Sequence, residues 1–169
     1  MKKIFIAILV MFTMCLPTFA KEKSTNMNYE YKKFDNTYVI RLNKNAEIIP
    51  VIKQFCTEKN IKLGTIEGIG AIKSATFGFF NPETKQYQEK TFVAPMEITS
   101  LLGNITTKDG ETYLHIHMNA AGSDYNTIGG HLVNATISLT GEIFIKEING
   151  TVEREFNNDV GLNLFNFVK

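Results

Sequence analysis

The chain has 169 residues, with 18 basic and 17 acidic side chains and a formal net charge of +1. Only two of the basic residues are arginines and no basic stripe is present, which argues against a protein that binds nucleic acid through a charged surface. Two cysteines, Cys15 and Cys56, are too few for a fold built on a disulfide framework.

The first 20 residues predict a cleavable secretory signal. Lys2 and Lys3 precede an apolar stretch over residues 4–14, and small side chains at Thr18 and Ala20 suit cleavage after Ala20. The apolar stretch is shorter than the roughly 20 residues of a membrane-spanning helix, so we expect no membrane span after cleavage. An uncleaved N-terminal anchor is the alternative. The order of these features favours a periplasmic or secreted protein.

Cleavage at this position changes the composition of what remains. Loss of the two lysines leaves 16 basic against 17 acidic residues, a net charge of −1. Cys15 is lost as well, so an intramolecular disulfide is excluded. The remaining 149 residues have the usual size of one domain and must be held together by a hydrophobic core.

The mature chain begins with a polar leader and a first strand within residues 21–34. Residues 37–42 predict a strand, and an apolar stripe at helical spacing predicts one main helix over residues 46–59. Pro50 fits this helix only in its first turn, where backbone N–H groups have no helical partner. Cys56 lies on the apolar stripe, which favours a buried small hydrophobe over a nucleophile.

The rest of the chain predicts strands separated by turn signals. The expected strands cover residues 61–69, 71–80, 86–92, 97–106, 112–119, 132–148 and 151–156. Residues 108–111 carry a hairpin signal, a Gly-rich loop precedes residue 132, and residues 157–169 read as a C-terminal tail. Sequential hairpins with one helix indicate an α+β fold with an antiparallel-rich sheet, in a single domain over residues 35–156.

All three histidines of the chain lie between residues 115 and 131. His115 and His117 are two positions apart in a predicted strand, so their side chains share a face while Ile116 points to the other. His131 follows two glycines, whose missing side chains permit a tight turn and a close approach to another element. Three neutral imidazoles with an open fourth position suit zinc or a similar divalent metal. Two polar residues on a solvated strand face, and an ordinary loop, are the alternative interpretation.

The sequence also resembles the PPC domain, a family conserved in plants and prokaryotes. The residues that carry the resemblance are Arg41, Gln54-Phe55-Cys56, the segment 64–71, the segment 97–105, His115-Ile116-His117 and Gly129-Gly130-His131-Leu132. They span about residues 35–150, nearly all of the mature chain.

This resemblance implies an α+β domain with an antiparallel sheet that assembles as a homotrimer. Acetolactate decarboxylase, a more distant resemblance of fold, carries zinc on a His-x-His pair and a further histidine. Carried over, the ligands here are His115, His117 and His131. The trimer interface could use the apolar residues Phe77 and Phe79–Phe80, which could equally fill the core of one subunit.

Two departures from the family pattern limit what the resemblance implies. Plant members bind DNA through a separate AT-hook segment of the Arg-Gly-Arg-Pro type, which this sequence lacks. A secretory signal is also unusual in the family, and export separates the protein from genomic DNA. We therefore expect that proteins of this family are described as DNA-binding, but the residues of this chain do not support DNA binding.

Whether the protein is an enzyme is left open by the sequence. An acid–base group near the metal would be needed, and Glu97 and Glu142 are weak candidates because a glutamate in a strand is usually solvent-facing. Arg41 could bind a substrate carboxylate or form a structural ion pair. One hypothesis is a metal-dependent protein that binds a small carboxylate-bearing molecule, as a lyase or hydrolase. The other is a non-catalytic trimeric interaction module.

Overall fold

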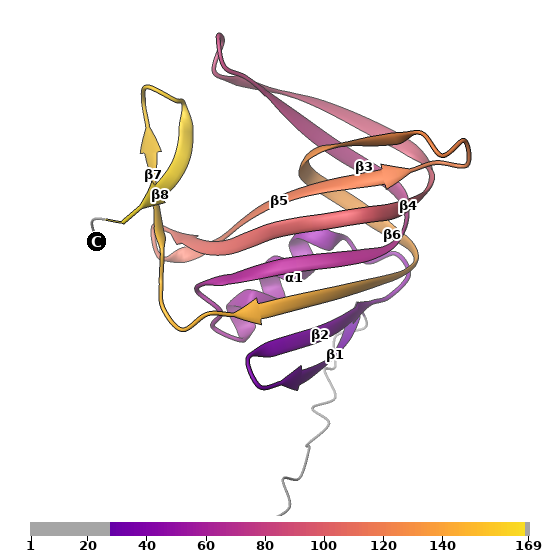
Figure 1. Ribbon diagram of the computed structural model, residues 1–169, viewed down its shortest axis with the longest axis horizontal. Coiled ribbons are helices and arrows are strands. Elements are labelled where there is room, and N and C mark those ends of the chain that lie inside the picture. The colour runs from indigo at the N-terminus through magenta and orange to yellow at the C-terminus, as the bar shows by residue number, and fades with distance from the viewer. Residues whose placement is uncertain (1–27, 168–169) are drawn as a thin grey trace, which may run out of the picture.

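The structure, a computed structural model, describes residues 28–167, so the expected signal segment lies outside the described residues. The elements are β1 (Tyr29–Phe34), β2 (Thr37–Leu42), α1 (Ile48–Glu58), β3 (Gly64–Asn81), β4 (Gln86–Lys108), β5 (Glu111–Ala121), β6 (Thr127–Glu147), β7 (Glu153–Asn157) and β8 (Leu162–Asn166). One helix lies against a single large sheet (Figure 1), which confirms the α+β prediction. Within residues 28–167, no helix has the length and apolar character needed to cross a membrane.

The strands form one sheet in the order β1-β2-β6-β3-β4-β7-β8, and β5 pairs with both β4 and β6. The pairs β3–β4, β4–β5, β5–β6 and β3–β6 therefore make a closed set of neighbours. All described strand pairs are antiparallel apart from a single parallel pairing of Thr107 with Glu153. This closure brings β5 and β6, which carry the histidines, side by side.

The segments 61–69 and 71–80, predicted as two strands, lie from residue 64 onward in one strand, β3, so the predicted break between them was wrong. The register shifts beside Gly70, which has a φ of +153° and lies so close to β6 that a Cβ there would be 2.5 Å from the Thr140 carbonyl oxygen. Gly70 therefore bends a continuous strand instead of ending it. The predicted strands 86–92 and 97–106 likewise lie within one long strand, β4.

Helix α1 covers one face of the sheet, against β5 and β6. Its apolar stripe is buried, and Pro50 lies in its first turn as expected. The Phe55 ring contacts Tyr29, Tyr31 and Tyr38, with ring centroids 5.1–5.5 Å apart. Burial of the neighbouring Cys56 raises its pKa to about 12, which keeps the thiol protonated and confirms its interpretation as a small core residue.

The C-terminal segment departs from the sequence-based expectation. Residues 151–156 were expected to turn back along residues 132–148, yet β7 pairs with β8 in a separate hairpin. Residues 157–169, expected as a tail, supply β8. This β7–β8 hairpin stands at one end of the sheet (Figure 1). It is positioned there by side-chain contacts described below, because sheet pairing to β4 involves one residue on each strand.

Alternation along the strands separates a core face from an open face. Ile116 and Met118 of β5 are buried under α1, while His115 and His117 point to the other side. In β3, Phe77 is 6% exposed and belongs to the core, whereas Phe79 is 66% exposed. These two phenylalanines are two positions apart and lie on the same side of the strand, so their difference arises because Phe79 is nearer the tip of the β3–β4 hairpin, beyond the core.

Candidate metal centre

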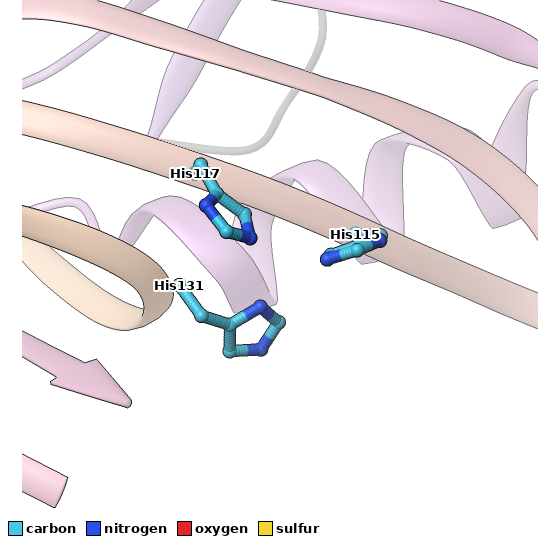
Figure 2. A group of neighbouring side chains, drawn as sticks. All are labelled: His115, His117 and His131. Atoms are coloured by element: carbon cyan, nitrogen blue, oxygen red, sulfur yellow. The ribbon is translucent and has the colours of Figure 1, made fainter. Parts of the chain in front are cut away.

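The three histidines converge on the open face of β5 and β6. His115 and His117 project from β5, and His131 of β6 is the direct cross-strand partner of His117. The ring centroids lie 5.2 Å (His115–His117), 5.3 Å (His115–His131) and 5.6 Å (His117–His131) apart. Figure 2 shows the three imidazoles turned toward one another with α1 behind the strand. The sequence-based expectation that these side chains come together is therefore met.

His131 reaches the site by strand pairing. Gly129 and Gly130 were expected in a loop, but they lie within β6. A Cβ at Gly129 would collide with Asn119 Oδ1 and would lie 2.5 Å from the Met118 carbonyl oxygen. The close approach expected of the glycines is confirmed, whereas the expected tight turn at this point is wrong.

The arrangement fits a divalent metal ion. One ligand nitrogen from each histidine lies within 4.8 Å of the others. A tetrahedral zinc ion with Zn–N bonds of about 2.0–2.1 Å needs nitrogens roughly 3.4 Å apart, which small rotations of the rings can supply. Among the described residues, His131 Nδ1 is buried without a hydrogen-bond partner. A buried, unpartnered nitrogen is costly, and coordination to a metal would remove that cost.

The surroundings of His115 and His131 favour the neutral, metal-binding form of these two imidazoles. Burial, followed by the nearby His131, Arg154 and His117 in that order, lowers the pKa of His115 to about 4. Burial also lowers the pKa of His131, with a further contribution from His117, while Glu89 opposes the shift. His115 and His131 are half-buried and His117 is exposed, so the site is open to solvent on the His117 side.

One wall of the site comes from the β7–β8 hairpin. Arg154 Nη2 donates to Asn104 Oδ1 at 2.9 Å, and Asn104 is the cross-strand partner of His115. The guanidinium lies over the rings of Tyr113 and Phe165, 4.8 Å and 4.4 Å from their centroids. The hairpin is thereby fixed next to His115.

Residues near the tip of the β3–β4 hairpin flank the site beside His131. The Tyr87 ring lies 5.4 Å from that of His131, and Glu89 is close enough to affect the His131 charge. Lys85 Nζ donates to the Asn158 carbonyl oxygen at 2.7 Å, so the tips of the two hairpins touch. The histidines therefore lie between two hairpins that contact each other.

A groove adjoins the site on the open face. It encloses about 330 Å³ and is lined by Glu67, Gly68, Ile69, Thr99, Ser100, Leu101, Leu102, Glu142 and Phe144. Leu102 pairs directly with His117 across β4 and β5, so the groove begins one strand away from the metal site. Its floor is apolar, with Glu67 and Glu142 as acidic groups.

The weak catalytic candidates lie outside the histidine group. Glu97 is exposed and five residues along β4 from Leu102, roughly 16 Å at strand spacing. Glu142 lines the groove but does not belong to the group of potential ligands. Arg41 Nη2 forms an exposed ion pair with Glu30 Oε1 at 3.0 Å, the structural alternative that the sequence left open.

Several residues around the site were missed by the sequence reasoning. The two-residue turn at Asp109 and Gly110 sets the β4–β5 register, so Asn104 could have been placed opposite His115 from the sequence alone. Tyr87, Glu89 and Arg154 carry no such signal. They reach the histidines through contacts between segments far apart in the chain.

Comparison with solved structures gives close relatives. A protein from Bacteroides thetaiotaomicron, described as a candidate DNA-binding protein, is 42% identical with a TM-score of 0.82, over 84% of this chain and 99% of that one. A metal-containing protein from Archaeoglobus fulgidus is 35% identical (TM-score 0.73; 81% and 95% covered). A plant- and prokaryote-conserved (PPC) protein from Pyrococcus horikoshii is 32% identical (TM-score 0.74; 85% and 98% covered).

More distant comparisons bear on the fold alone. The α-acetolactate decarboxylase of Bacillus subtilis is 12% identical with a TM-score of 0.50, which confirms the distant resemblance of fold. Comparison with curated proteins finds no match. Residues 29–149 match the family described as the Plants and Prokaryotes Conserved (PCC) domain, also written PPC. This match covers most of the chain and includes all three histidines, so the chain belongs to the PPC domain family.

Proposed function

We propose that this protein binds one divalent metal ion, zinc in the simplest case, through His115, His117 and His131. The observation that carries the proposal is the convergence of these side chains from facing positions of β5 and β6. The description of the Archaeoglobus fulgidus relative as metal-containing supports it. The fourth position on the ion is left for water or a small molecule.

The residues of the site would have two roles, metal binding and access for a ligand. The three imidazoles hold the ion, and the exposed side of His117 leaves a path for a ligand. A bound divalent ion supplies a Lewis acid and lowers the pKa of a bound water. Because the glutamates considered as acid–base groups, Glu97 and Glu142, do not belong to the histidine group, we propose metal and small-molecule binding and assign no lyase or hydrolase reaction.

Metal analysis of protein purified without an affinity tag tests this proposal. We expect close to one zinc ion per chain by plasma mass spectrometry, and uptake of one zinc per chain after removal with a chelator. A metal content far below one per chain, with no uptake of added zinc, would contradict it.

We also propose that the protein is exported and forms a homotrimer. The signal pattern in residues 1–20 supports export to the periplasm or beyond the cell. Family membership supports the trimer, and Ile69, Leu102 and Phe144 leave apolar surface exposed on the open face. An intact N-terminus on exported protein, or a monomer mass by light scattering at micromolar concentration, would refute the respective part.

A non-catalytic interaction module is the second candidate, and its family label raises the question of DNA. The Bacteroides thetaiotaomicron relative is described as a candidate DNA-binding protein. Here the net charge after cleavage is −1, Arg41 is paired with Glu30, and Arg154 is buried. We therefore expect weak duplex binding without sequence preference, which a gel shift at physiological salt can test.

A further inference from the structure

Arg154 is a buried cation whose hydrogen-bond acceptors are all neutral. Its side chain is 7% exposed. Nε donates to Thr106 Oγ1 at 2.9 Å, Nη1 to the Asn163 carbonyl oxygen at 2.8 Å, and Nη2 to Asn104 Oδ1 at 2.9 Å. The guanidinium also lies over the Tyr113 and Phe165 rings, so several contacts hold it in one place and none of them neutralises its charge.

The place in which it is held is beside the histidine site. Asn104, which accepts from Arg154, lies directly across from His115, and Tyr113 precedes His115 by two residues on the same strand. The charge of Arg154 acts on the His115 imidazole, whose pKa it helps to lower. A ligand at the metal would therefore share a partly buried environment with a fixed positive charge.

A fixed charge of this kind discriminates between ligands. In a partly buried site, the energy between two charges is described by an effective dielectric constant of about 20, so it is larger than in bulk water. Salt screens such an interaction only weakly. An anion next to the metal gains from the Arg154 charge, and a neutral ligand of similar size does not. Such a difference in affinity is the basis of specificity.

We propose that Arg154 is a specificity-determining residue that makes the open position of the metal site select a small anion, a carboxylate in the simplest organic case, over a neutral ligand. The inference rests on the proposed metal site. Arg154 lies beyond residue 149, where the family match ends, so this preference does not follow from membership of the family. It depends on the β7–β8 hairpin that carries Arg154.

The test uses the chain without residues 1–20, the expected mature form, loaded with cobalt(II). The visible spectrum of the bound cobalt reports on added ligands. Acetate serves as the anion, and imidazole at pH 8 as the neutral ligand. In the Arg154→Gln variant, we expect acetate to bind on the order of tenfold more weakly, with imidazole affinity unchanged within about twofold. Arg41→Gln removes the same charge from the chain's other arginine, paired with Glu30, and should change neither affinity.

A second variant covers the case in which Arg154→Gln does not fold. Asn104→Asp retains an acceptor for Arg154 and places a negative charge between it and His115. We expect a similar loss of acetate affinity with imidazole binding retained.

Two results would overturn the inference while the metal proposal stands. The first is an unchanged acetate affinity in the folded variants. The second is an equal loss of acetate and imidazole affinity, because Arg154 would then be a structural residue. Failure of the unsubstituted protein to take up cobalt would refute the metal site, and the inference with it.

Discussion

The two faces of strand β5 have different roles although their residues alternate along one short segment. Ile116 and Met118 are each 1% exposed and pack under α1, while His115 and His117 point to the open face beside His131. The core face contributes burial energy, and the open face contributes ligands. Strand alternation thus separates stability from chemistry, and a substitution on one face should leave the property of the other largely intact.

The largest expected effect comes from the core face. Ile116→Ala removes fully buried methyl groups and leaves a cavity, so we expect the free energy of unfolding to fall by about 2–5 kcal/mol. Urea denaturation of the metal-free protein measures this. Val93→Ala, at an 82% exposed position of β4 that belongs neither to the core nor to the proposed trimer surface, is the control and should change stability by less than about 1 kcal/mol. A comparable loss for Val93→Ala would mean that the loss at Ile116 is not specific to the core face.

The next effect concerns the open face. His117→Ala removes one ligand without touching the apolar side of β5, and we expect zinc affinity to fall more than a hundredfold, since losing even a residue that only supports a ligand costs about 10–100-fold. Competition with a chromogenic chelator measures the affinity. Leu102→Ala, which truncates the side chain opposite His117, should keep wild-type affinity. Equal metal content in the His117→Ala variant and the wild type would show that the histidines are ordinary surface residues.

Acid pH should affect the metal-free protein through the open face. The pKa of His115 is about 4 in the folded chain and near 6.5 in an unfolded one, so unfolding takes up a proton between these values. The contribution of His115 is therefore present above about pH 6.5 and is lost as the pH falls toward 4. Urea unfolding at pH 7.5, 5.5 and 4.5 in chelator should show a smaller pH dependence for His115→Asn. Identical pH profiles for the two proteins would contradict this.

The smallest effect is expected at Glu97. Its side chain is exposed and lies outside the histidine group, so Glu97→Gln should change the free energy of unfolding by no more than about 0.5 kcal/mol. Zinc affinity should stay within about twofold of the wild type in the same chelator competition. A clear loss of metal in this variant would mean that Glu97 reaches the site in a way that its position on β4 does not suggest.

Much of the site could be predicted because it depends on local spacing. His115 and His117 share a face in any regular strand, and the two-residue turn at Asp109 and Gly110 sets which β4 residues lie opposite them. The fold class followed in the same way from alternation and one helical stripe. The errors concern where one strand ends and the next begins. Gly70 predicted the end of a strand, because a sequence does not show whether a glycine bends a strand or breaks it.

The amino-acid sequence by itself therefore determined which side chains share a face, where α1 lies in the chain, and that the histidines are close in sequence. Tertiary structure alone decided that His131 pairs directly with His117, because that register depends on how β3, β4, β5 and β6 close on one another. It also decided that Arg154 lies beside His115, 39 positions earlier in the chain. Local periodicity is set by backbone geometry, whereas contacts between distant segments depend on the packing of the whole sheet.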